Sequence, residues 1–303
     1  MLLQKSLDHS ACENDQISLK KNREVGLNWK AFAVRAIIAL IFGPLLLYLA
    51  WMGGIYWFIL ITALVILSQY EYLGLAHKKQ ANGQFWFGAM ASLALLTSFY
   101  LYGEHGLVPV LIIFVIIFLF GELYRESGSR ILNSAVSVFA FLFFPLFLGS
   151  FILIREMPRF YGLDTQPAGG WIIMVLLSTW ICDTAAYMVG SYVGKHKLIE
   201  RISPNKSIEG TVAGFLFSIL VAWICHITFI EGLRLLDSLL VGTIVGSIGQ
   251  YGDLFESMFK RDAGVKDSSN LIPGHGGILD RFDSLILSAP VVYLYLRTIV
   301  FGL

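Results

Sequence analysis

The run GTVAGFLFSILVAWICHITFIE, residues 210–231, decides the fold class of this chain. It contains no Asp, Glu, Lys or Arg before its last residue, Glu231. A helix needs about 20 mostly apolar residues to cross a lipid bilayer, and every backbone polar group inside the lipid must be hydrogen-bonded within the segment. The run therefore predicts a membrane-spanning α-helix.

Apolar runs of the same kind recur along the chain. Of its 303 residues, 56% are hydrophobic and 14% are charged, whereas soluble domains carry about 25% charged residues. We predict an all-α polytopic membrane protein with about nine transmembrane helices and a polar cavity that opens to the cytoplasmic side. The expected spans are residues 31–50, 53–70, 84–102, 107–122, 132–154, 170–189, 210–231, 237–258 and 283–302.

Basic residues indicate the orientation of these spans. Most of the 22 Lys and Arg residues lie in the N-terminal region and in the loops after the even-numbered spans, and basic loops usually stay in the cytoplasm. We therefore expect a multi-pass integral membrane protein, in the inner or plasma membrane if it is bacterial. Its N-terminus and the charged loops after the sixth and eighth spans would be cytoplasmic, and its C-terminus would lie on the other side.

The chain starts with a polar segment. Residues 1–28 are interpreted as a polar cytoplasmic tail and residues 29–303 as a single transmembrane catalytic domain. A secretory signal would place a short apolar run in this tail, but the first apolar run begins near Ala31 and is too long. The net charge of +1 gives no reason to expect a nucleic-acid partner. No disulfide framework is expected from the three scattered cysteines, Cys12, Cys182 and Cys225.

One segment contrasts with its apolar surroundings: SMFKRDAGVKDSSNLIPGHGGILDRFD, from Ser257 to Asp283. Charge beside a membrane span is costly, so a dense charged and glycine-rich segment there indicates a functional site. Its mixture of cations and carboxylates suits a phosphate-bearing substrate together with a divalent metal.

Carboxylates at helical spacing point to a metal site. Asp253, Ser257 and Lys260 occupy positions i, i+4 and i+7, which share one face of a helix. Asp280 and Asp283 are three residues apart at the start of the last span. Carboxylates with phosphate oxygens are the usual ligands of Mg²⁺. The alternative is that Asp280 and Asp283 only cap the start of a helix, where negative side chains are favoured.

Glycines surround His275 in the sequence PGHGG. Gly274, Gly276 and Gly277 let the backbone approach a ligand closely, and a helix that starts after a glycine-rich loop offers an anion-binding site. The alternative is an ordinary tight turn with a surface histidine.

A second polar loop, SPNKSIEG, runs from Ser203 to Gly210. Lys206 suits phosphate oxygens, Ser207 can donate a hydrogen bond, and Glu209 can accept one from a ribose or a base. Taken alone, this loop also fits a solvated turn.

Other charged residues lie in or near the spans. Asp183, in the sixth span, needs a cation, a metal or water as its partner. Solvation at the membrane interface is the simplest explanation for a further group: Glu71, His77, Glu104, His105, Glu122 and Glu126.

The segment from Ser257 to Asp283 resembles the signature of the phosphatidate cytidylyltransferases, also called CDP-diacylglycerol synthases. That pattern runs Ser, Lys-Arg, Lys-Asp, Pro-x-His-Gly-Gly and Asp-Arg-x-Asp, and this chain matches every position. The resemblance extends upstream to Asp183–Gly190 and Ser203–Gly210. The residues before about 170 resemble the family only as a series of hydrophobic spans.

The resemblance implies that CTP and phosphatidate, a membrane lipid, react to give CDP-diacylglycerol and diphosphate in phospholipid biosynthesis. It implies Mg²⁺ at the site, with K⁺ a candidate for a second cation, and membrane enzymes of this kind often form homodimers. The implied metal ligands are Asp253, Asp280 and Asp283, with Asp183 as a fourth. The implied catalytic residues are Lys260, Arg261, Lys266, Asp267, His275 and Arg281. The implied substrate-binding residues are Ser203, Lys206, Ser207, Glu209, Ser257, Gly276 and Gly277.

Two rival functions remain open at this point. A CTP-dependent lipid kinase would use the same nucleotide but transfer its γ-phosphate to a lipid alcohol. A transporter or channel would use the intramembrane carboxylates to bind ions. The full signature argues against the kinase, and the absence of visible internal repeats argues against the transporter.

Overall fold

The structure, a computed structural model, describes residues 29–126, 128–162, 164, 166–269, 271 and 276–303, without the side chains of residues 29–39 and 166. The expected polar tail therefore lies outside the described residues. The chain divides into two compact units, Met1–Pro44 and Leu45–Leu303. All elements from α3 onward, and the whole candidate site, belong to the second unit.

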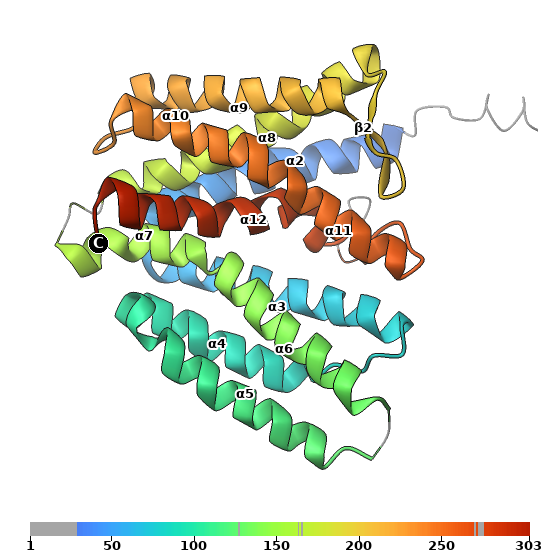
Figure 1. The fold of residues 1–303 in the computed structure, drawn as a ribbon. Helices are drawn as coiled ribbons and strands as arrows, with labels where there is room; N and C mark the ends of the chain where they lie inside the picture. The colour runs from blue at the N-terminus through green and yellow to red at the C-terminus, as the bar shows by residue number, and fades with distance from the viewer. Residues whose placement is uncertain (1–28, 127, 163, 165, 270, 272–275) are drawn as a thin grey trace, which may run out of the picture. The chain divides into compact units, whose positions relative to one another are not determined.

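The described residues are mostly helical, as predicted, and include one antiparallel two-stranded hairpin (Figure 1). The strands are β1 (Lys197–Ile199) and β2 (Ser203–Ser207). The helices are α2 (Trp29–Met52), α3 (Gly54–Lys78), α4 (Phe85–Tyr102), η1 (Gly103–Gly106), α5 (Leu107–Leu123), α6 (Arg130–Phe147), α7 (Ser150–Tyr161), α8 (Gln166–Val193), α9 (Ile208–Thr228), α10 (Leu235–Ile244), η2 (Val245–Gly249), α11 (Gln250–Asp262), α12 (Leu279–Tyr295) and η3 (Leu296–Val300).

Six stretches of the described chain are long and apolar enough to cross a membrane. The protein is thus an all-α multi-pass membrane protein, but the expected count of nine spans is not confirmed. The six stretches are Gly54–Lys78, Phe85–Leu123, Arg130–Phe147, Pro167–Val193, Ile208–Thr228 and Leu279–Val300.

The difference in count has local causes. The 39 residues of Phe85–Leu123 include two expected spans, because η1 turns the chain so that α4 and α5 lie side by side (Figure 1). Gly103 has a φ of 62°, a conformation that favours glycine. The expected span 132–154 is divided between α6 and α7. The expected span 237–258 is divided by η2, a π-helical turn between α10 and α11.

Small residues bring α8 and α9 into close contact. A Cβ atom on Gly214 of α9 would lie 2.8 Å from the carbonyl oxygen of Cys182 on α8. Membrane helices commonly approach each other closely through such residues. This packing places Asp183 of α8 beside the N-terminal half of α9.

A glycine also allows close packing between α11 and α12. A Cβ atom on Gly252 would collide with the carbonyl oxygen of Asp283, so only glycine allows the two helices to approach this closely. The contact lies one residue from Asp253 and therefore brings the charged ends of both helices together. A larger residue at position 252 would separate them.

Candidate active site

Three carboxylates form a cluster between α11 and α12. Asp253 and Glu256 come from α11 and Asp283 from the first turns of α12, and their ligand oxygens all lie within 4.8 Å of one another. Glu256 is only 3% exposed, and the Nζ atom of Lys260 lies 2.6 Å from its Oε2. Negative groups packed this closely repel one another unless a cation lies between them. Oxygen ligands at this spacing fit a divalent cation such as Mg²⁺.

Lys206 and Ser257 contact the outer side of this cluster. The Nζ atom of Lys206 lies 2.7 Å from Oδ2 of Asp253 and donates to the backbone oxygen of Gln250 at 3.2 Å. Ser257 donates to Oδ1 of Asp253 at 3.3 Å. The expectation that Asp253 and Ser257 share one helical face is therefore confirmed.

Asp183 approaches the cluster from α8. Its side chain is exposed, hydrogen-bonds with Ser284 and interacts electrostatically with Asp253 and Lys206. The structure thus brings Asp183 toward Asp253 and Asp283, although it is 70 or more residues distant in the chain.

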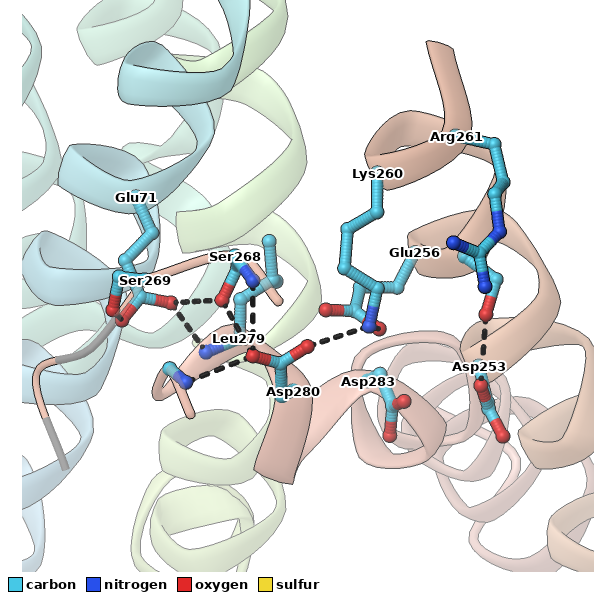
Figure 2. A network of polar contacts seen from close by, with 12 residues as sticks. Glu71, Asp253, Glu256, Lys260, Arg261, Ser268, Ser269, Leu279, Asp280 and Asp283 are labelled. Atoms are coloured by element: carbon cyan, nitrogen blue, oxygen red, sulfur yellow. Dashed lines mark hydrogen bonds and ion pairs between the residues drawn. The ribbon is translucent and has the colours of Figure 1, made fainter. Parts of the chain in front are cut away.

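Asp280 belongs to a different set of contacts (Figure 2). Its Oδ1 pairs with Nζ of Lys260 at 2.5 Å, and its Oδ2 accepts hydrogen bonds from the backbone N–H groups of Ser268 at 3.1 Å and Gly277 at 2.8 Å. The two alternatives for Asp280 and Asp283 therefore divide between them. Asp280 caps the start of α12, and Asp283 joins the carboxylate cluster.

Lys260 connects the two sets of contacts. Its Nζ lies 2.6 Å from Oε2 of Glu256 as well as 2.5 Å from Asp280. Burial alone would lower the pKa of Lys260, but the adjacent carboxylates of Glu256 and Asp280 outweigh it and hold this pKa above its ordinary value. The adjacent carboxylates thus favour the charged form of this lysine.

Glu71 is a site residue that the sequence reasoning missed. It lies in α3, is 2% exposed and accepts four hydrogen bonds, so solvation at the interface is the wrong explanation for it. The same correction applies to Glu122, which is buried and accepts hydrogen bonds from Gln84 and Asn133, both at 2.9 Å. The signal available in the sequence was a carboxylate within an apolar helix, which indicates a functional site by default.

Glu256 was also missed. It is three residues after Asp253 on the same helix, and this spacing predicts a shared face. Its position inside the expected span 237–258 was a further signal, since a carboxylate at that depth needs a partner.

The start of α12 explains two of the glycines. Gly276 has a φ of 81°, and a Cβ atom on Gly277 would collide with the side chains of Ser268 and Glu71. The backbone N–H groups of Gly277, Ile278 and Leu279 already donate to Asp280 and Glu71. Two of the protein's own carboxylates therefore lie at this helix start, and the predicted anion site there stays a prediction. His275 and Gly274 lie outside the described residues.

Four further predicted residues of this segment are exposed. Arg261 is exposed and donates to the backbone oxygen of Ile202 at 3.4 Å, toward the β-hairpin. Lys266, Asp267 and Arg281 are exposed. The contact of Arg261 thus links the C-terminal part of α11 to the loop between β1 and β2.

The loop from Ser203 to Gly210 contains β2 and the start of α9. Ser203 pairs with Ile199 in the hairpin, and Ser207 is buried and caps α9 by accepting from the N–H of Gly210 at 3.2 Å. Glu209 lies 2.7 Å from Nδ1 of His196 and accepts from its backbone N–H. These contacts stabilise the turn that carries Lys206 to Asp253.

Comparison with known proteins identifies the family of this chain. The model of the cytidylyltransferase family matches residues 33–299, which is nearly the whole chain. The chain belongs to the cytidylyltransferase family. The match includes all the described carboxylates and lysines of the site.

Curated relatives of this cytidylyltransferase-family chain share one name, phosphatidate cytidylyltransferase. The Thermotoga maritima protein is 32% identical over 252 residues, covering 78% of this chain and 86% of the relative. The Aquifex aeolicus protein is 39% identical over 174 residues, covering 57% and 61%. The Staphylococcus epidermidis protein is 45% identical over 137 residues, covering 45% and 53%. The chain therefore spans about half the length of the staphylococcal relatives it matches.

Proposed function

We propose that this protein is a CTP:phosphatidate cytidylyltransferase that produces CDP-diacylglycerol and diphosphate. The observation that carries the proposal is the cluster of Asp253, Glu256 and Asp283, flanked by Lys206 and Lys260, in a membrane protein of the cytidylyltransferase family. Such a site suits two phosphate-bearing substrates and a divalent cation. The name of the relatives supports phosphatidate as the acceptor.

The proposed reaction is a nucleotidyl transfer. A phosphate oxygen of phosphatidate attacks the α-phosphorus of CTP, the bond from that phosphorus to the bridging oxygen breaks, and diphosphate leaves with the electron pair. The nucleophile is already an anion, so no strong base is needed. Such transfers depend on positioning and on charge neutralisation.

The carboxylate cluster would hold Mg²⁺ through Asp253, Glu256 and Asp283, and the ion would offset negative charge on the reacting phosphates. Asp183 and Asp280 remain candidates for additional ligands, and K⁺ for a second cation. Lys206 and Lys260 orient Asp253 and Glu256 and reduce their mutual repulsion.

The exposed residues around the cluster are proposed to bind the substrates. We assign phosphate neutralisation to Arg261, Lys266 and Arg281, and we propose Asp267 and His275 as further catalytic residues. Ser203, Lys206, Ser207, Glu209, Ser257, Gly276 and Gly277 remain the proposed nucleotide-side residues. A very small cavity beside Glu256 and Asp283 is lined mostly by apolar residues such as Phe143 and Phe255.

The proposed orientation places the site at the cytoplasmic surface. In Figure 1 the C-terminal ends of α3, α5 and α11 lie at the same end of the helices as the β1–β2 hairpin, and the C-terminus lies at the opposite end. These are the regions that carry most of the basic residues, which supports the positive-inside assignment. Nine crossings, a cytoplasmic cavity, a homodimer and the lack of a nucleic-acid partner belong to the same proposal.

The test uses the purified protein in detergent with Mg²⁺, phosphatidate and CTP labelled separately at its α- and γ-phosphates. We expect α-label in the lipid and γ-label in diphosphate. Label from the γ-phosphate in the lipid would identify a lipid kinase instead. No transfer of either label would contradict the proposed activity, and ion uptake into proteoliposomes without nucleotide would favour the transporter.

A further inference from the structure

The N-cap residue of α12 provides no side-chain acceptor for the first N–H groups of the helix. The residue before its first helical residue is Ile278, whose side chain cannot accept a hydrogen bond. The first N–H groups of a helix have no partner within the helix, and those near the cluster are buried. A distant residue, Glu71 of α3, supplies the missing acceptor.

Each oxygen of Glu71 accepts one backbone N–H and lies within hydrogen-bond distance of one hydroxyl group. Oε1 takes the N–H of Ile278 at 2.8 Å and the hydroxyl of Ser269 at 2.6 Å. Oε2 takes the N–H of Leu279 at 2.8 Å and lies 2.9 Å from the hydroxyl oxygen of Ser268. One carboxylate thus joins three parts of the chain: α3, the segment after α11 and the start of α12.

Ser268 continues these contacts to Asp280. Its backbone N–H donates to Oδ2 of Asp280, and its hydroxyl oxygen lies 2.9 Å from both Asp280 and Glu71. A hydroxyl has one proton, so the N–H can serve Asp280 while the hydroxyl serves Glu71. Figure 2 shows Glu71, Ser268, Asp280 and Lys260 following one another across the site.

The same line of contacts ends in the carboxylate cluster. Asp280 pairs with Lys260, and Lys260 pairs with Glu256, whose carboxylate lies in the cluster with Asp253 and Asp283. A shift of α12 at its start would therefore move Asp280 and Asp283 together relative to α11. Groups that orient a metal's ligands in this way control affinity without touching the metal.

We propose that Glu71 is a positioning residue for the reaction: it fixes the start of α12 against α3 and thereby sets the distance of Asp283 from Asp253 and Glu256. The proposal rests on the proposed cytidylyl transfer at this cluster. It assigns a role in that site to α3, which lies outside the signature segment from Ser257 to Asp283.

The test compares Glu71→Gln and Glu71→Asp with a matched control, Glu122→Gln. Glu122 is another buried, hydrogen-bonded glutamate of an apolar helix, but none of its described partners belongs to the site. All variants are made in the full chain and purified in detergent. The readouts are kcat, the KM for CTP, the Mg²⁺ concentration that gives half-maximal activity, and the shift of the melting temperature that Mg²⁺ produces.

Glu71→Gln retains the size of the side chain but places an NH₂ group where one oxygen faces a backbone N–H and a hydroxyl group. We expect its kcat to fall and its half-maximal Mg²⁺ concentration to rise, each about tenfold, which is the usual cost of losing a group that orients metal ligands. The Mg²⁺-induced melting shift should shrink in parallel. Glu71→Asp keeps the charge and should lie between Glu71→Gln and the wild type. Glu122→Gln should lower the melting temperature but keep wild-type kcat and Mg²⁺ dependence.

Wild-type kcat and Mg²⁺ dependence in folded Glu71→Gln would overturn the proposal, as would equal losses in Glu71→Gln and Glu122→Gln. If Glu71→Gln does not fold, Ser268→Ala tests the proposal instead. It removes only the Ser268 hydroxyl, which lies between Glu71 and Asp280. It should raise the half-maximal Mg²⁺ concentration about threefold or more, and no change would overturn the proposal. If the wild type transfers no label, the proposed function fails, and the Mg²⁺-induced melting shift alone decides the role of Glu71. A wild type that shows neither response overturns both.

Discussion

The two ends of α12 both carry buried or half-buried charge, but they are built differently. At the C-terminal end, Glu104 accepts from Tyr293 at 3.0 Å and pairs with Arg297, so the charges balance. At the N-terminal end, carboxylates outnumber the lysines that contact them. The carboxylates are Glu71, Asp253, Glu256, Asp280 and Asp283, and the lysines are Lys206 and Lys260. The surplus of one sign of charge fits the cation site proposed above, whereas the balanced pair fits a structural role.

The largest expected effect comes from the surplus end, with Asp283→Asn. It retains the volume of the side chain but removes one negative oxygen from the cluster. We expect kcat to fall about a thousandfold, because charge stabilisation in such transfers is among the largest contributions to rate. Activity is measured by transfer of the α-label, with the melting temperature as the control for folding. Asp283→Ala should likewise remain in the membrane and lose turnover, and wild-type activity in either variant would exclude Asp283 as a metal ligand.

Asp280→Asn separates capping from metal binding. Asparagine caps helices as well as aspartate does, so the bonds from Ser268 and Gly277 can persist while the ion pair with Lys260 weakens. We expect kcat to fall about tenfold, far less than in Asp283→Asn. The Mg²⁺ titrations of the two variants decide the matter. Equal losses would show that Asp280 is a ligand, as the resemblance implies.

Lys206→Met tests the cation that reaches Asp253 from β2. Methionine keeps much of the length and loses the charge that lies 2.7 Å from the carboxylate. We expect the KM for CTP to rise and kcat to fall, together by about thirtyfold in kcat/KM, since a hydrogen bond to a charged group contributes about 1.5–3 kcal/mol. Steady-state kinetics measure both, with Lys197→Met in β1 as the matched control. An unchanged kcat/KM would mean that Lys206 has no part in the site.

Gly277→Ala tests the close approach of Glu71. The added methyl group would collide with Ser268 and Glu71, and overpacking of this kind costs about 1–3 kcal/mol. The expected result is a lower melting temperature in detergent and a weaker response to Mg²⁺. Gly264→Ala is a useful comparison, because its Cβ atom would meet no described atom within 4 Å although its φ of 70° is strained. Its Mg²⁺ response should stay at the wild-type value even if its melting temperature falls.

The smallest effect is expected at the balanced end, from Glu104→Gln. It weakens one partly exposed ion pair with Arg297, and such pairs contribute about 1 kcal/mol or less. The melting temperature should fall slightly and kcat should stay within about twofold of the wild type. A large loss of kcat would show that the two ends of α12 are functionally coupled. The C-terminal end would then not be purely structural.

Much of the site could be predicted from short-range pattern. The spacing of Asp253 and Ser257 predicted one helical face, and their hydrogen bond confirms it. Asp280 and Asp283 were expected to act alike because they are three residues apart, yet they contact different partners. The residue pattern along one helix cannot show which neighbouring element each side chain contacts. Asp280 contacts Lys260 and Ser268, and these contacts separate it from Asp283.

Glu71 shows where local reasoning stops. Its hydrogen bonds to Ile278 and Leu279 join residues separated by 207 and 208 positions. No periodicity in α3 points to α12, and a glutamate seven residues before the end of an apolar helix also fits a solvated interface. Its role follows only from packing close enough for a buried carboxylate to replace a cap.

The sequence by itself determined that this is a helical membrane protein of the cytidylyltransferase family, and it predicted most of the site residues between Ser203 and Asp283. Length, hydropathy and a long motif are properties of consecutive residues, so they need no knowledge of the fold. The tertiary structure decided which carboxylates meet, which one caps a helix and which distant glutamate holds them. Those outcomes depend on how closely two helices can approach, and at Gly252 and Gly277 the absence of a single side chain sets that distance.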